Sequence, residues 1–312
     1  MKGDFNILFS FHYGRHWDLD ALMANEFKGA RVFADSGAYS AMTQGAAISC
    51  NEYIEWCHKW RKYFVAIANL DVIGNAEATL VNQQEMEAAG IPAIPVYHAG
   101  EPWHFFESYC RDYPYVALGG TAGMTTSKLF PWHIKCFKHV RDAGLDTKFH
   151  AFGMTSLKIM LGLPWYSVDS SSWGSGYRFG TLRLFDPRIN KMCAVLLWDR
   201  ASVMRHAGLI QRYGCDPLAL LDKEEYHWTT AARLSAASWR EVEAYCRRVW
   251  GPIPLKAALF SNGDQQDGMN IYLAGTATPV LEQTMPHGML LYLADGSQNA
   301  LMVAMEGGDH GG

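Results

Sequence analysis

Short apolar runs rich in β-branched and aromatic residues alternate along the chain with segments of helical character. This alternation is typical of parallel βα units, in which helices cover both faces of a buried sheet. The runs predict eight strands, at residues 6–11, 31–35, 65–72, 93–98, 115–120, 148–153, 166–169 and 193–198. Helices are expected between them at residues 19–26, 51–63, 76–88, 103–110, 128–143 and 156–161.

Eight parallel strands with intervening helices predict an α/β fold of the closed (β/α)8 type, the TIM barrel, over residues 1–200. A doubly wound sheet fits less well, because no Gly-x-Gly-x-x-Gly turn follows the first strand. Helical segments within residues 201–250 predict an extension that packs on the barrel. Residues 251–312 are richer in glycine and are expected to form an appendage, disordered near its end, although residues 269–275 resemble the opening strand of another βα unit.

Composition agrees with a folded soluble enzyme and limits the kinds of partner. Hydrophobic residues make up 49% and charged residues 19% of the chain, unlike a disordered protein. The net charge of −4 gives no global attraction to a polyanion, so any nucleic acid must bind locally. The seven cysteines form no Cys-x-Cys or Cys-x-x-Cys pair, which favours reduced thiols over a zinc site. No signal peptide and no run of roughly 20 apolar residues is present, so a cytoplasmic protein is expected.

Ionisable residues stand where several of the predicted strands end. Asp35 ends the second strand, Asp71 the third and Asp169 the seventh. In a barrel the carboxyl ends of the parallel strands meet at one mouth, where the active sites of this fold lie. We therefore expect one polar pocket there, to which the other strand ends add His98, Gly119, Gly120 and His150.

Each of these residues also has a structural interpretation, since an aspartate before a Ser-Gly turn often caps backbone amides. Their convergence favours chemistry, and two kinds of chemistry fit. One is glycosyl transfer, in which one carboxylate attacks the anomeric carbon and another moves the proton of the leaving group. The other is a divalent metal held by carboxylates and imidazoles.

Four segments resemble motifs of the tRNA-guanine transglycosylases. Residues 35–39, Asp-Ser-Gly-Ala-Tyr, resemble DSGGF, and residues 117–123 resemble the GGLAVGE strand end. Residues 150–154 resemble HLMGVG, and residues 167–170, Ser-Val-Asp-Ser, stand where the family has its nucleophile. The motifs keep the family's order over residues 33–173, roughly half of the chain.

The resemblance implies an enzyme that exchanges a guanine base through a covalent intermediate. Asp169 would be the nucleophile that attacks C1′, and Asp35 would shuttle the proton. Tyr39 would stack on the base and Asp71 would accept hydrogen bonds from its N1 and 2-amino edge, while the glycine amides would approach O6. The full predicted substrate-binding set is Tyr39, Ser36, Asp71, His98, Gly119, Gly120, His150, Phe152, Gly153, Trp173 and Arg178.

Two departures from the family affect the expected substrate. His98 stands about where the tRNA enzymes have a glutamine that contacts the base, which leaves the preferred 7-substituent open. The family's Cys-x-Cys-x-x-Cys zinc motif is absent, so the chain looks more like the phage-type DNA-guanine transglycosylases, which insert a 7-deazaguanine. We therefore expect DNA and a free 7-deazaguanine base as partners, with tRNA as the alternative, no cofactor and no membrane. A homodimer stays open, and a phage-encoded chain would act in the host cytoplasm.

Two rival functions also have support. A metal-dependent TIM-barrel hydrolase would use as ligands Asp35, Asp71, His98, His150 and Asp169, although the sequence contains no His-x-His pair. The other rival is a non-catalytic barrel that binds DNA or modified bases. Such a module would have no need of the pair of aspartates that the resemblance assigns to catalysis.

Overall fold

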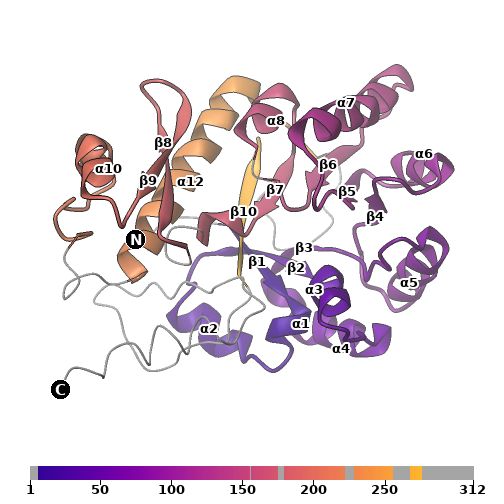
Figure 1. Ribbon diagram of the computed structural model, residues 1–312. Coiled ribbons are helices and arrows are strands. Elements are labelled where there is room, and N and C mark those ends of the chain that lie inside the picture. The colour runs from indigo at the N-terminus through magenta and orange to yellow at the C-terminus, as the bar shows by residue number, and fades with distance from the viewer. Residues whose placement is uncertain (1–5, 155, 175–178, 222–227, 256–267, 276–312) are drawn as a thin grey trace.

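The computed structural model describes residues 6–154, 156–174, 179–221, 228–255 and 268–275 (Figure 1). Within them, one sheet of eight parallel strands curls on itself and is flanked by helices, an α/β arrangement compatible with a TIM-like fold. The strands lie in the order β3-β2-β1-β10-β7-β6-β5-β4. Their bounds are β1 (Asn6–Ser10), β2 (Arg31–Asp35), β3 (Phe64–Ile67), β4 (Val96–His98), β5 (Tyr115–Gly119), β6 (Lys148–Ala151), β7 (Ser167–Ser170) and β10 (Asn270–Gly275).

The two strands at the ends of this order, β3 and β4, do not pair as strands in the described part of the chain, so their ladder does not close the sheet into a barrel. A single parallel bridge lies between them, from Ala68 to Ile94. Two backbone hydrogen bonds support it, from Ile94 N to Ile67 O at 2.8 Å and from Asn69 N to Ile94 O at 3.0 Å.

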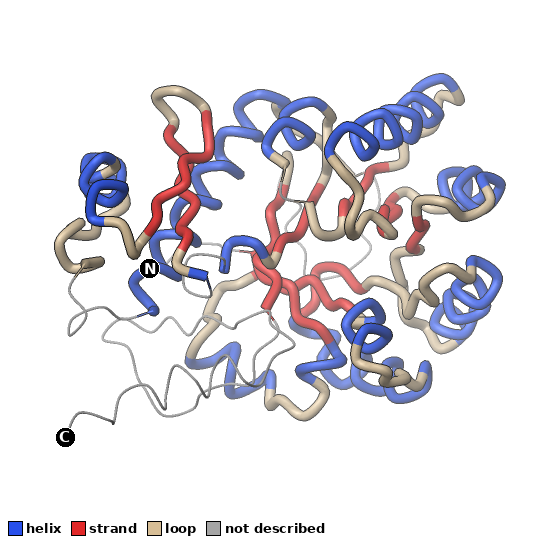
Figure 2. The backbone as a smooth tube through the Cα atoms, in the orientation of Figure 1, coloured by secondary structure: helices blue, strands red, loops and turns tan. Residues whose placement is uncertain are grey.

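Helices connect the strands and surround the sheet (Figure 2). Each helix expected before residue 165 is present, and short polar side chains begin several of them: Asn75 Oδ1, for example, accepts from Ala78 N at 3.0 Å. No helix in the described ranges combines the length and the apolar character needed to cross a bilayer. The bounds are α1 (Phe11–Gly14), α2 (Leu19–Asn25), α3 (Ala38–Thr43), α4 (Cys50–Trp60), η1 (Arg61–Tyr63), α5 (Ala76–Ala88), α6 (Trp103–Asp112), α7 (Thr126–Asp142), α8 (Leu157–Gly162), η2 (Ser172–Gly174), α10 (Arg200–Arg205), α11 (Ala207–Arg212) and α12 (Trp228–Trp250).

The eighth strand of the sheet is β10, and the expectation that residues 193–198 supply it was wrong. β10 inserts between β1 and β7, with Ile7 opposite Leu273 and Asp169 opposite Tyr272. It lies within residues 251–312, which the sequence analysis assigned to an appendage. The far end of that segment, residues 276–312, lies outside the described residues.

Residues 193–198 instead contribute to an antiparallel hairpin of β8 (Thr181–Asp186) and β9 (Lys191–Leu196). The physical reason is the connection between them, which runs only from Asp186 to Lys191. Such a short turn can join antiparallel strands, whereas a parallel pair needs a crossover of a dozen or more residues. The hairpin shares a small apolar core with the helices that follow it, made by Leu182, Leu184, Val195, Val203, Leu209, Ile210, Leu220 and Leu234.

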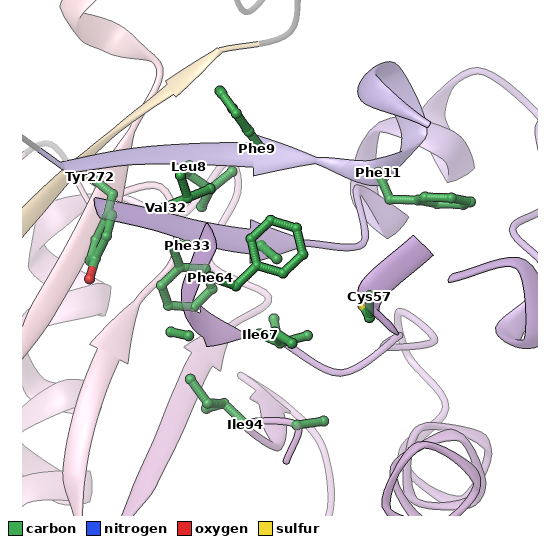
Figure 3. Packing of buried hydrophobic residues seen from close by; sticks show 14 of the residues in the cluster. Leu8, Phe9, Phe11, Val32, Phe33, Cys57, Phe64, Ile67, Ile94 and Tyr272 are labelled. Atoms are coloured by element: carbon green, nitrogen blue, oxygen red, sulfur yellow. The ribbon is translucent and has the colours of Figure 1, made fainter. Parts of the chain in front are cut away.

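An apolar core fills the inside of the curled sheet next to the polar strand ends. Figure 3 shows Phe33 of β2 with Phe64 and Ile67 of β3, and Tyr272 of β10 at the opposite side of the same cluster. Phe33 has no exposed surface, and its ring makes an edge contact with Tyr272 at a centroid distance of 5.3 Å. The core therefore holds the strands that carry the polar ends in fixed relative positions.

Helix α12 fastens β10 to the sheet through a buried carboxylate. Glu243 Oε2 accepts from Ile271 N at 2.8 Å and from Asn6 Nδ2 at 3.0 Å, so it ties β10 to β1. Arg247 pairs with Glu243 Oε1 at 2.8 Å and donates to Asn270 Oδ1 at 2.9 Å. Burial raises the pKa of Glu243, while Arg247 and the hydrogen bonds from Ile271 and Asn6 act to lower it.

We expect Glu243→Ala to lower the free energy of unfolding by about 2–4 kcal/mol, because it removes the acceptor of the Ile271 amide and the carboxylate that pairs with Arg247. Urea unfolding followed by circular dichroism measures this. The matched control is Glu241→Ala, since Glu241 lies on the same helix and is 3.7 Å from Arg212 in a partly exposed pair, which contributes less than about 1 kcal/mol. Equal stability of the two variants would contradict the anchoring role of Glu243.

Candidate active site

The carboxyl ends of the parallel strands bring two aspartates, Asp71 and Asp169, within electrostatic reach of Asp35. Asp35 ends β2, Asp71 follows β3, and Asp169 is the third residue of β7. The negative charges of Asp71 and Asp169 both act on Asp35 and raise its pKa. The structure thus brings together the three carboxylates that the sequence analysis expected at one mouth.

Asp35 is held as a proton-carrying acid near neutral pH. Burial raises its pKa to about 8, and the charges of Asp71 and Asp169 act in the same direction. The backbone amides of Gly37 and Ser36 oppose the rise, and Gly37 N lies 3.0 Å from Oδ2. Below pH 8 this carboxyl group is mostly protonated, so it can donate a proton to a bound ligand and take one back.

The Asp-Ser-Gly turn after β2 places the Gly37 amide against Asp35 and the Ser36 hydroxyl against Asp71. Gly37 adopts a positive φ of 77°, and an added Cβ would lie 2.2 Å from Ser10 Oγ, so only glycine fits. Ser36 Oγ accepts from Ala38 N at 3.2 Å and donates to Asp71 Oδ1 at 3.3 Å. Tyr39, two residues further in α3, leaves 52% of its surface exposed, so its ring is available to a ligand.

Asp71 is connected to His98 and, through it, to Glu101. His98 Nε2 lies 2.9 Å from Asp71 Oδ2, and His98 Nδ1 lies 2.9 Å from Glu101 Oε1. Burial acts to lower the pKa of His98, but the hydrogen bonds and charges of Asp71 and Glu101 outweigh it and raise the pKa to about 9. At neutral pH the ring is therefore a cation between two carboxylates.

Gly119 and Gly120 make room for His98. A Cβ at Gly119 would lie 2.9 Å from His98 Cδ2, and one at Gly120 would lie 2.7 Å from His98 Cβ. Gly120 also has a positive φ of 70°. Both glycines thus allow a close approach to His98, and the expectation that their backbone amides approach a ligand stays a prediction.

Asp169 accepts from a backbone amide and lies beside a histidine. Gly153 N donates to Asp169 Oδ1 at 2.8 Å, and His150 Nε2 lies 3.5 Å from the same oxygen. Among the described residues, no hydrogen bond to Oδ2 is present, and the side chain keeps about 10% of its surface exposed. One oxygen is therefore held in place while the other can meet a ligand.

His150 sits on a buried polar and aromatic support beneath Asp169. Its Nδ1 lies 2.6 Å from Ser167 Oγ, which also bonds the hydroxyl of Tyr115. The imidazole stacks on Phe33 at a centroid distance of 4.5 Å and meets Phe152 edge-on at 4.6 Å. Burial lowers the pKa of His150, and Asp169 acts in the opposite direction without cancelling this effect. The lowered pKa favours a neutral ring.

One of the expected substrate-binding residues, Trp173, is not brought to this site. Trp173 is 2% exposed and donates from Nε1 to Ala274 O at 3.0 Å, so its ring belongs to the core between η2 and β10. Arg178 lies outside the described residues. Phe152 and Gly153, also expected to bind substrate, contact site residues instead: Phe152 meets His150, and Gly153 supplies the amide to Asp169.

The site also contains residues that the sequence analysis missed. Glu101 stands in the loop after β4, three residues beyond His98, and this i,i+3 spacing is the only local signal for it. Tyr115 and Ser167 come from different strands and meet through the sheet, far apart in sequence. A hydroxyl inside a buried strand gives no sequence pattern that separates a site residue from a core residue.

The geometry gives little support to a metal centre. In the part of the chain that the structure describes, no three His, Cys, Asp or Glu side chains converge as metal ligands. Both ring nitrogens of His98 face carboxylates, and a protonated imidazole has no lone pair for a metal ion. The described side chains that converge here are paired with one another, Ser36 and His98 with Asp71, and His98 with Glu101.

Comparison with known proteins gives no family for this chain. Neither a scan against known protein families nor a search of curated proteins finds a match.

Proposed function

We propose that this protein is an enzyme of the guanine transglycosylase superfamily that exchanges guanine in DNA for a 7-deazaguanine base. The proposal rests on one observation: two neighbouring carboxyl groups are held in different ways. The pKa of Asp35 is raised to about 8, while Asp169 accepts from the Gly153 amide and lies 3.5 Å from His150 Nε2. Two carboxyl groups in different environments are what a retaining glycosyl transfer needs.

In the first step, Asp169 attacks C1′ of the target nucleotide. The bond between Asp169 Oδ2 and C1′ forms as the bond between C1′ and N9 of guanine breaks, and the electron pair of that bond leaves with the base. The protonated Asp35 delivers its proton to the departing guanine. A glycosyl ester on Asp169 and an ionised Asp35 remain.

In the second step, the incoming base replaces the ester. Asp35, now a carboxylate, removes the N9 proton of the 7-deazaguanine, and N9 attacks C1′ on the face that guanine left. The C1′–O bond breaks and Asp169 recovers its charge. Two displacements at one carbon retain the configuration of the sugar.

Asp71 and Tyr39 bind the base in this proposal. Asp71 accepts hydrogen bonds from N1–H and the 2-amino group, since its oxygens keep lone pairs beyond those used by Ser36 and His98. A base without these donors leaves the carboxylate without partners, which is how a polar site rejects it. The exposed ring of Tyr39 stacks on the base and offsets the few kcal/mol that removal of a nucleotide from the stack requires.

We also infer that the curled sheet is a (β/α)8 barrel. With β10 in place, neighbouring strands follow one another from β1 to β7 and back to β1, except between β3 and β4. The Ala68–Ile94 bridge and its two hydrogen bonds occupy that remaining seam. In a barrel, the strand ends that carry Asp35, Asp71 and Asp169 share one face, where the active sites of this fold lie.

Incubation with labelled guanine tests the proposal. Duplex DNA, single-stranded DNA and tRNA are offered in parallel, and label incorporated into each polymer is counted. We expect incorporation into DNA, and its suppression by unlabelled 7-cyano-7-deazaguanine. Incorporation into tRNA alone would make the chain a tRNA enzyme. No incorporation into any polymer, together with a stoichiometric metal ion in the purified protein, would overturn the proposal in favour of a metal-dependent hydrolase.

A further inference from the structure

The imidazole of His98 is enclosed by two carboxylates and two glycines. Besides its ring contacts, the backbone amide of His98 donates to Glu101 Oε2 at 2.9 Å, so Glu101 grips both the backbone and the ring. The side chains of His98 and Glu101 keep only 4% and 6% of their surface exposed. Gly119 lies against the ring, where an added Cβ would come within 2.9 Å of Cδ2, and Gly120 lies against Cβ of His98.

This geometry does not support the expected contact between His98 and the base. Nδ1 and Nε2 each face a carboxylate oxygen at 2.9 Å, so neither nitrogen is left for a ligand. Asp71, in contrast, uses one hydrogen bond at each oxygen, from Ser36 at Oδ1 and from His98 at Oδ2. Its plane is fixed from both ends, and each oxygen keeps accepting capacity.

We propose that Glu101 and His98 form a positioning pair that holds the Asp71 carboxylate in one plane, so that it accepts two adjacent N–H donors from a guanine-type base. The inference rests on the proposed function for the identity of the base, and it adds Glu101 and a new role for His98. Glu101 does not touch the ligand in this arrangement. It acts through the imidazole, as outer partners act on the groups that they orient.

The charged groups around the imidazole are Asp71 and Glu101, and Asp35 lies within electrostatic reach of Asp71. Removing the charge of Glu101 takes away one of the two anions that keep His98 protonated. The ring then loses its proton at lower pH, and the hydrogen bond that it donates to Asp71 is no longer assisted by a positive charge. Asp71 therefore loses its fixed orientation without any change in its own side chain.

The test is Glu101→Gln, which preserves shape, with two readouts on the full chain. The first is NMR of the ring nitrogens of ¹⁵N-labelled histidine, with the His98 signals assigned from a His98→Gln variant. We expect the His98 ring to carry both protons at pH 8 in the original protein and to lose one by that pH in Glu101→Gln. The second is equilibrium binding of guanine and of hypoxanthine, which lacks the 2-amino group.

We expect Glu101→Gln to weaken guanine binding about tenfold, the order of a lost charge-assisted hydrogen bond, and hypoxanthine binding much less. The control is Glu77→Gln, an exposed carboxylate in the first turn of α5, which should change neither readout. If Glu101→Gln leaves the protonation of His98 and the ratio of the two affinities unchanged, the positioning pair is refuted even where base exchange occurs. If no polymer is modified but guanine binds and responds to Glu101→Gln, the pair stands and the proposed reaction fails.

Discussion

Replacing Asp169 by asparagine is expected to lower guanine exchange by at least on the order of 10⁴-fold, because an amide cannot form the glycosyl ester. Asparagine keeps the size of the side chain. Its amide oxygen can accept from Gly153 N, which lies 2.8 Å from Asp169 Oδ1 in the original protein. The fold and the affinity for DNA should therefore be preserved. The measurement is the initial rate of labelled guanine incorporation, followed by a denaturing gel of enzyme mixed with DNA.

The gel distinguishes loss of chemistry from loss of binding. The original protein should show a covalent band between enzyme and DNA that disappears when free base is added, and Asp169→Asn should show none. Asp112→Asn, at the exposed end of α6, is the matched control and should retain both exchange and the covalent band. Exchange that survives in Asp169→Asn would mean that another group attacks the sugar.

Replacing Asp35 by asparagine is expected to slow exchange by about 10²–10⁴-fold, the usual contribution of a positioned acid or base. The original protein should also lose activity as the pH rises through about 8, because Asp35 then loses the proton that it must deliver to the departing base. The residual rate of Asp35→Asn should not follow that profile. Rates measured between pH 6 and 9 check both statements.

The same variant should raise stability, which a purely structural aspartate would not do. The pKa of Asp35 is raised by folding from 3.8 to about 8, so its protonated form contributes stability that is fully present below pH 3.8. That contribution is lost as the pH rises through 8, because Asp35 then becomes a buried anion near the negative charges of Asp71 and Asp169. Asparagine carries no charge, and we expect thermal unfolding at pH 8.5 to show a gain on the order of 2 kcal/mol.

An unchanged or lower melting temperature at that pH would contradict the raised pKa of Asp35. If the residual exchange rate of Asp35→Asn still falls as the pH rises through about 8, the proton is transferred by another group. The comparison at pH 5, where Asp35 is protonated in the folded protein, serves as an internal control. There the stability gain of the variant should be smaller than at pH 8.5.

The local elements of this fold are predictable because they depend on neighbours in the sequence. Residues 76–88 were predicted as a helix and form α5, whose N-terminus Asn75 caps by accepting from Ala78 N. Residues 31–35 were predicted as a strand and form β2. The eighth strand escaped prediction, since the apolar runs at residues 193–198 and 269–275 look alike and only pairing partners separate them.

The sequence alone predicts four residues of the candidate site: Asp35, Asp71, His98 and Asp169. An ionisable side chain at the end of a buried strand is unusual, and the strand ends of a parallel sheet share an edge. The tertiary structure alone decided what surrounds each of them. It paired the two imidazole nitrogens of His98 with Glu101 and Asp71, and it placed Trp173 in the core. It also set the proton affinity of Asp35, because burial and the fields of two distant carboxylates depend on three-dimensional separation, which the order of residues does not contain.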